Sequence, residues 1–201
     1  DCQYRFTKTD GTPANFGDFA WADPFSEGYA AVQQRVGTDY LWGFINKKGD
    51  LVVKPMFTWV GKFGSGLAPV CIGTSTENCT IGFINTSGEF EINPQYEYFE
   101  FYDSESSWGI TAQHGFFEGL ARVMVDQKIG YINSTGKMVI QPQFTYGGNF
   151  VNGLARVTVN GKMGFINKKG VLVVPAIYDS AFNFYQGRAA VEVDGKWGFI
   201  S

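Results

Sequence analysis

Apolar and polar residues alternate with a period of two over short stretches of the chain, which is typical of half-buried β-strands. Residues 154–159 read Leu-Ala-Arg-Val-Thr-Val, and residues 171–174 form a short apolar run, Val-Leu-Val-Val. The dipeptide Asn160-Gly161 follows the first stretch and is a strong signal for a type I′ hairpin, because both central residues of that turn need a positive φ. The pattern therefore predicts short strands joined by tight turns.

The same pattern repeats along the chain. A glycine precedes the first strand of each copy, at Gly28, Gly66, Gly119, Gly153 and Gly187. The last three are equally spaced and give a basic repeat of about 34 residues, and the two longer spacings before them contain insertions. We expect a single repeat domain, 1–201, with repeats at approximately 1–24 (partial), 25–62, 63–116, 117–149, 150–183 and 184–201 (partial).

A second turn signal divides each repeat into three strands. Asparagine at the first turn position and glycine at the fourth are typical of a type I turn followed by a left-handed residue. The turns are Asn46–Gly49, Asn85–Gly88, Asn133–Gly136 and Asn167–Gly170. Each repeat is therefore predicted to be a three-stranded antiparallel meander. A linker with an aromatic residue at each end, such as Phe144 to Phe150, leads to the next repeat and is expected to pin the crossover into the core.

Several elements in fixed order carry a family resemblance. The segments Gly-Leu-Ala-x-Val, Trp-Gly-Phe-Ile and x-x-Pro-x-Tyr-Asp resemble the WG-containing repeat family, which occurs mostly in bacterial proteins, over nearly the whole chain. Only Trp42 and Trp197 keep the tryptophan, and the other copies have Ile81, Ile129 and Met163, which indicates an apolar slot and no chemical role for the indole. The resemblance implies an interaction scaffold and carries over no catalytic residue.

Two all-β architectures fit such an array. A propeller-like closed ring is favoured if the N-terminal strand near Pro13 completes the C-terminal hairpin that ends at Ile200, because a ring leaves no exposed strand edge. An open β-solenoid of stacked meanders is the alternative, since propeller blades usually have four strands and not three.

Composition narrows the function. Hydrophobic residues make up 44% of the 201-residue chain and charged residues 17%, so a core can form. The net charge is −3 and the 16 Lys and Arg are scattered, which argues against nucleic-acid binding. His114 is the one histidine, which excludes multi-histidine metal sites. No apolar run reaches the roughly 18 residues of a transmembrane segment. We expect no metal site and no cofactor.

The cysteines predict a disulfide. Cys71 and Cys79 bracket an insertion, Ile72 to Asn78, between the first and second strands of the second repeat, and both lie outside the repeat pattern. A bond between them would fit an exported protein, extracellular or at the cell surface of a bacterium. The alternative is a pair of free thiols in a cytosolic protein.

Candidate binding residues are aromatic. One register two residues after the linker aromatic holds Trp21, Trp59, Tyr98 and Tyr146, with Ser180 in the last repeat; the insertion Phe99 to Gly115 adds Tyr102, Trp108 and His114. Such residues can form stacking platforms, although wedge packing between repeats is the alternative. The predicted function is a non-enzymatic binding or scaffold module that presents aromatic-rich loops to a protein or glycan.

Two other functions remain open from the sequence. Carboxylates of the 99–115 insertion, Glu100, Asp103 and Glu105, could serve a glycoside-active enzyme, and the chain could be a structural spacer in a longer repeat protein. Glu27 and Glu118, which precede repeat glycines, are interpreted as turn or surface residues and not as a catalytic pair.

Overall fold

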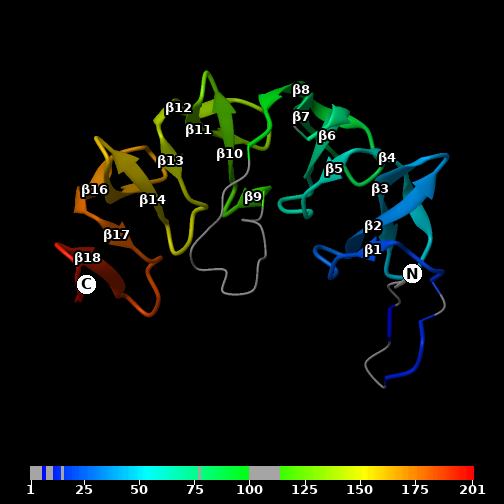
Figure 1. Ribbon diagram of the computed structural model, residues 1–201, viewed down its shortest axis with the longest axis horizontal. Helices are drawn as coiled ribbons and strands as arrows, with labels where there is room; N and C mark the ends of the chain where they lie inside the picture. Colours follow the sequence, from blue (N-terminus) through cyan, green and yellow to red (C-terminus); the bar gives the residue numbers. More distant parts are fainter. Residues whose placement is uncertain (1–5, 8–10, 15, 77, 100–113) are drawn as a thin grey trace. The chain divides into compact units, whose positions relative to one another are not determined.

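The computed structural model describes residues 6–7, 11–14, 16–76, 78–99 and 114–201. Strands, turns and bends account for the regular structure in these ranges, which contain no helix, so the all-β prediction is confirmed. Accordingly, the described ranges hold no helix of the length and apolarity that crossing a membrane requires. Figure 1 labels the strands along the chain, which divides into two compact units. The N-terminal unit is Asp1–Tyr98 with Gln113–Gly115, and the C-terminal unit is Phe99–Ala112 with Phe116–Ser201.

The N-terminal unit contains two antiparallel meanders in which neighbouring strands pair in chain order. The first comprises β1 (Trp21–Ala22), β2 (Tyr29–Val36), β3 (Asp39–Asn46) and β4 (Leu51–Phe57). The second comprises β5 (Trp59–Val60), β6 (Ala68–Ser75), β7 (Asn78–Ile84) and β8 (Phe90–Glu97).

The C-terminal unit continues the same arrangement with three meanders. The first comprises β9 (Phe116–Phe117), β10 (Leu120–Val125), β11 (Lys128–Asn133) and β12 (Met138–Phe144). The second comprises β13 (Tyr146–Gly147), β14 (Leu154–Val159), β15 (Lys162–Asn167) and β16 (Leu172–Tyr178). The third comprises β17 (Ser180–Ala181), β18 (Ala189–Val193) and β19 (Lys196–Ile200).

A short linker strand at the start of four meanders, β1, β5, β13 and β17, corrects the prediction of three strands per repeat, whereas β9 pairs with β10 across the turn at Gly119. The linker places two residues beside the following strand, as in β13, where Tyr146 pairs with Thr158 and Gly147 with Val157. A two-residue strand is too short to produce an alternating pattern in the sequence, which is why the prediction missed it. Complete meanders therefore have four strands.

The predicted turns are confirmed. The side-chain Oδ1 of Asn167 accepts the backbone N–H of Lys169 at 2.9 Å and of Val171 at 3.1 Å, and Gly170 follows with φ +78°. At the other turn, Asn160 and Gly161 have φ values of 50° and 76°, the left-handed pair that a type I′ hairpin requires.

The third long strand lies so close to the Trp-Gly-Phe-Ile segment that only glycine fits at the second position of that segment. A Cβ atom at Gly164 would lie 2.7 Å from the carbonyl oxygen of Val174 and 2.8 Å from the backbone nitrogen of Ala176. The pairing register of β15 and β16 shifts at this point. Only a residue without a side chain lets the two backbones approach so closely. Gly43, Gly82 and Gly130 have equivalent surroundings.

Aromatic contacts join successive meanders within each unit. An aromatic residue of the second long strand packs edge-on against the phenylalanine that precedes the first long strand of the next meander: Phe44 on Phe63 at 4.8 Å in the N-terminal unit, and Phe165 on Phe184 at 4.9 Å in the C-terminal unit, measured between ring centroids. The core of each unit is thus built mainly from neighbouring meanders. Among the described residues, no pairing closes either unit into a barrel, and the closed ring stays a prediction.

Candidate binding surface

Three of the predicted aromatic residues come together in the N-terminal unit. Trp59 begins β5, Tyr98 follows β8, and His114 lies in the described end of the insertion. The Trp59 ring lies 5.6 Å from Tyr98 and 4.9 Å from His114, and the Tyr98 and His114 rings are 6.2 Å apart. All three side chains are partly exposed. We call these three residues the aromatic cluster.

The strand geometry positions Trp59. Its neighbour Val60 is buried and pairs with the fully buried Val70, so the alternation of side chains along β5 directs Trp59 away from that core. After β5, the backbone N–H of Gly61 donates to the carbonyl oxygen of Pro69 at 2.8 Å. A Cβ at Gly61 would lie 2.8 Å from the carbonyl oxygen of His114, so this glycine lets the insertion's end approach the cluster.

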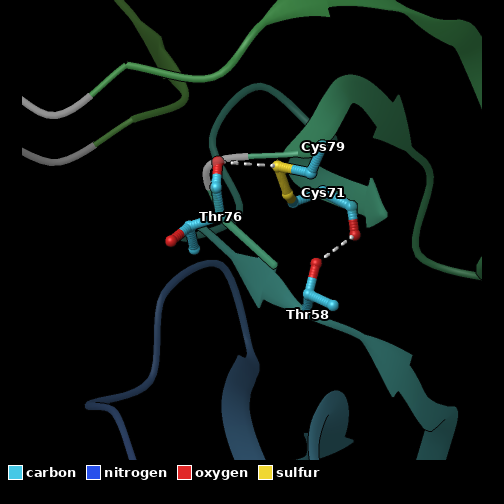
Figure 2. Close-up of a disulfide and its surroundings, with 4 residues drawn as sticks. All are labelled: Thr58, Cys71, Thr76 and Cys79. Atoms are coloured by element: carbon cyan, nitrogen blue, oxygen red, sulfur yellow. Dashed lines mark hydrogen bonds between the residues drawn. A yellow bond between two sulfur atoms is a disulfide. The ribbon is translucent and has the colours of Figure 1, made fainter. Parts of the chain in front are cut away.

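A disulfide supports the strand that pairs with Trp59. Cys71 pairs with Trp59 in the ladder and is bonded to Cys79, with the two Cα atoms 5.6 Å apart, as the sequence predicted. Figure 2 shows the bond together with Thr58, whose hydroxyl donates to the carbonyl oxygen of Cys71 at 3.2 Å, and Thr76, whose carbonyl oxygen lies 3.6 Å from the Cys79 sulfur. The disulfide therefore braces the hairpin next to the aromatic cluster.

The sequence analysis places the insertion between the first and second long strands, but in the structure most of it belongs to the strands themselves. Strand β6 continues through the insertion to Ser75, and strand β7 begins at Asn78. Gly73 pairs with Cys79, and Ser75 pairs with Asn78. The extra residues lengthen the hairpin, because extended backbones that pair with one another satisfy their hydrogen bonds without a new turn.

The three rings of the cluster are oriented so that they present both faces and edges. The Tyr98 and His114 ring planes are 23° apart, whereas Trp59 lies at 68° to Tyr98 and 82° to His114. The cluster can therefore offer ring faces and edges in two directions. It has the composition of a recognition surface, with large apolar area and a few polar groups.

The other predicted binding residues lie elsewhere or outside the described residues. Trp21 is 45% exposed at β1, and its indole N–H donates to Asp23 at 3.1 Å. Tyr146 is half-buried in the C-terminal unit, where its ring lies 5.9 Å from the guanidinium of Arg156. Outside the described residues are Tyr102, Trp108, Glu100, Asp103 and Glu105.

Two arginines that the sequence analysis did not single out have structural roles. Arg156 is 1% exposed and donates to the carbonyl oxygen of Ala181 at 2.7 Å and to the side chain of Asn183 at 3.0 Å. Arg122, at the same position one repeat earlier, donates to the carbonyl oxygen of Gly147 at 3.1 Å. The recurrence of arginine at one repeat position could have indicated a structural role. The alternating pattern instead suggested that these polar residues face solvent.

Glu118 stabilises a turn in the following meander of the C-terminal unit. Its carboxylate accepts the backbone N–H of Gly153 at 3.0 Å and forms an ion pair with Lys168 at 3.1 Å. Burial raises the pKa of this carboxyl, but the hydrogen bonds from Lys168, Gly153 and Asn152 together lower it below its ordinary value. Glu118 is therefore a turn residue, as interpreted from the sequence, and it also links its own turn to the next meander.

The comparisons with known proteins agree with the repeat pattern. The family model described as the WG containing repeat matches residues 18–35, 42–73, 81–106, 129–162 and 163–197, which together make up more than half of the chain. A search of the curated proteins gave no match. From the repeated matches along its length, the chain belongs to the WG containing repeat family.

Proposed function

We propose that the protein is a non-enzymatic binding module whose contact surface is the aromatic cluster of Trp59, Tyr98 and His114. The observation that supports this proposal is the convergence of three partly exposed rings from three separate segments of the chain. Trp and Tyr provide large contact area at small rotamer cost, which is why they dominate binding hot spots. Wedge packing between repeats is the alternative, and it predicts a large loss of stability in Trp59→Ala.

The chemistry of the cluster defines the ligand. Ring faces take apolar surface, and ring edges take polar groups. A sugar ring has apolar faces edged by hydroxyl groups, and a proline or aromatic side chain of a peptide has an apolar face beside backbone amides. The partner is accordingly a glycan or a protein segment with that combination.

The residues around Trp59 hold the aromatic cluster in one geometry before a ligand binds. The Cys71–Cys79 disulfide and the buried pair Val60 and Val70 hold the two strands beside Trp59. A surface held in one geometry loses less conformational entropy when a ligand binds, which raises affinity. The disulfide also supports an exported protein, extracellular or at the cell surface, since such bonds persist in oxidising compartments.

The proposal includes a closed, propeller-like ring of repeats. Complete meanders of four strands have the usual strand number of a propeller blade, which favours a closed ring over an open β-solenoid. Small-angle scattering distinguishes the two: a ring gives a compact particle with a central void, and a solenoid gives an elongated one.

A parallel screen tests the proposed binding function. The protein is applied to a glycan array and to a displayed peptide library, and every hit is compared between the wild type and Trp59→Ala. Tyr40→Ala is the matched control, because Tyr40 is a 54% exposed aromatic residue on another hairpin of the same unit. Ligands that need Trp59 and not Tyr40 support the proposal. Two screens without a Trp59-dependent ligand would count against it.

A further inference from the structure

One meander of the C-terminal unit contains the same tripeptide, Val-Asn-Gly, at two turns. Asn152-Gly153 lies before β14, and Asn160-Gly161 joins β14 to β15. The two asparagines have nearly equal left-handed φ values, 53° and 50°. Glycine has no Cβ, so its backbone nitrogen can approach the side-chain carbonyl carbon of the asparagine before it. The fold therefore places one chemically reactive dipeptide in two different environments.

At the first turn, other meanders hold both groups that would react. The side-chain nitrogen of Asn152 donates to the carbonyl oxygen of Phe184 at 3.0 Å, and the backbone N–H of Gly153 donates to the carboxylate of Glu118 at 3.0 Å. The ion pair with Lys168 keeps this carboxylate at the turn. If the nitrogen of Gly153 lost its proton, the new negative charge would face Glu118, which raises the cost of that step.

The second turn lies at the exposed end of a hairpin. Val159 and Lys162 form the last ladder pair of β14 and β15, and Asn160 and Gly161 lie beyond it, exposed to solvent. Among the described residues, neither the side chain of Asn160 nor the N–H of Gly161 has a hydrogen-bond partner in another meander. The backbone of this turn can therefore change its conformation without breaking contacts between repeats.

The hairpin also accepts aspartate in place of asparagine. In three meanders of the C-terminal unit, a valine and a lysine form the last ladder pair of this hairpin. The first residue of the turn is Asp126, Asn160 or Asp194, with φ values of 49°, 50° and 51°. Hydrolysis of the Asn160 amide to a carboxylate is therefore compatible with the existing turn.

We propose that Asn160 is a site of spontaneous deamidation and that Glu118 and Phe184 protect Asn152 from the same reaction. The nitrogen of Gly161 gives its proton to solvent and attacks the side-chain carbonyl carbon of Asn160. A new C–N bond closes a succinimide ring, the bond to the side-chain nitrogen breaks, and ammonia leaves with a proton from water. A water molecule then adds to either ring carbonyl and opens the ring to aspartate or isoaspartate.

The two products affect the turn differently. Aspartate adds one negative charge beside Lys162, which forms an ion pair with Asp179. Isoaspartate adds a carbon atom to the main chain, so the turn loses the geometry of a two-residue type I′ hairpin. The reaction therefore changes the surface charge in one product and the hairpin end in the other, and both changes are independent of the aromatic cluster.

Peptide mapping by mass spectrometry tests the proposal on the full chain. The native protein is incubated in mildly alkaline buffer, and the conversion of each asparagine is followed with time. We expect aspartate and isoaspartate at Asn160 to form about tenfold faster, or more, than at Asn152, because two hydrogen bonds must break at Asn152 first. In guanidinium chloride, the two Val-Asn-Gly segments are expected to react at similar rates, so that a difference in the native protein comes from the fold.

Glu118→Ala tests the protection of Asn152. The variant removes the acceptor of the Gly153 N–H, and we expect deamidation at Asn152 to accelerate several-fold while the rate at Asn160 stays unchanged. Glu118→Gln keeps an acceptor oxygen and is expected to give a smaller acceleration. Asn160→Asp is expected to melt at the temperature of the wild type, because aspartate fits this turn.

Three results would overturn the proposal. The first is a native protein in which Asn160 reacts no faster than Asn152. The second is a Glu118→Ala variant in which the rate at Asn152 does not rise, or rises equally at both sites, as general unfolding would cause. The third is a lower melting temperature for Asn160→Asp, which would show that the turn does not accept the product.

Discussion

The carboxylate of Glu27 accepts the backbone N–H of Gly66 at 2.8 Å, although the two residues are 39 positions apart in the chain. Its other oxygen accepts the N–H of Ser65 at the same distance. The turn before the first long strand of the second meander is thus held by the corresponding turn of the first meander. In the C-terminal unit, Asn152 contributes in another way, donating to the carbonyl oxygen of Phe184 at 3.0 Å. These hydrogen bonds add directional contacts to the apolar packing between repeats.

The stabilising effect of Glu118 is expected to depend on pH. Its pKa in the folded protein lies below the ordinary 4.5, because the bonds from Lys168, Gly153 and Asn152 outweigh burial. The contribution is therefore complete above the unfolded-state pKa and is lost as the pH falls through the folded-state pKa. We expect Glu118→Gln to lower the melting temperature slightly at pH 7, and this difference from the wild type to shrink as the pH falls below 4.5. A difference that stays constant over this range would contradict the assignment.

Gly170→Val tests the second turn. The substitution forces a β-branched residue to φ +78° and places its Cβ 3.1 Å from the Cγ2 atom of Ile140. We expect the free energy of unfolding to fall by about 1–2 kcal/mol, measured by denaturant titration. Val171→Ala is the control, because Val171 is 54% exposed and its loss should change little. An unchanged denaturation midpoint for Gly170→Val would rule out the turn assignment.

The disulfide is expected to contribute a limited amount of stability. Cys71 and Cys79 are 8 positions apart, and a short loop restricts the unfolded chain only modestly. Replacing both by serine should cost about 2–3 kcal/mol at most, and less if the extended hairpin persists. Intact mass after alkylation without reduction should show no modification of these two residues. Alkylation of all three cysteines in the native protein would be incompatible with the bond.

Tyr131→Phe tests a buried hydrogen bond in the C-terminal unit. The Tyr131 hydroxyl donates to the carbonyl oxygen of Gly148 at 2.8 Å, and burial raises its pKa, so the group is a neutral donor. Removing the hydroxyl leaves that carbonyl without this donor, and we expect a loss of about 1–2 kcal/mol in the free energy of unfolding. Tyr40→Phe, at an exposed position, is the control. Equal stability of the two variants would mean that the bond contributes nothing.

Local signals predicted most of the fold. The turn at Asn167 and Gly170 depends on residues within the turn itself, so its sequence was sufficient to predict it. The linker strands, the burial of Arg156 and the turn contact of Glu27 depend on residues in other segments of the chain, and no local pattern reports such pairings.

The candidate site was predictable in part for the same reason. The repeat register identified Trp59 and Tyr98 as candidates, because successive repeats place them at equivalent positions. Their approach to His114 depends on the path of the insertion and on Gly61, whose missing side chain admits the backbone of His114. A single sequence does not encode that path in a recognisable pattern.

The central claim is that the aromatic cluster binds a partner, and titration calorimetry with a ligand from the screens tests it most directly. The wild type, Trp59→Ala and the Tyr40→Ala control are titrated under one set of conditions, and the melting temperature of each is recorded. We predict that Trp59→Ala weakens binding about tenfold or more with a small change in melting temperature, while Tyr40→Ala binds as the wild type does. Unchanged affinity in Trp59→Ala, or a large loss of its stability, would contradict the claim and assign Trp59 to packing.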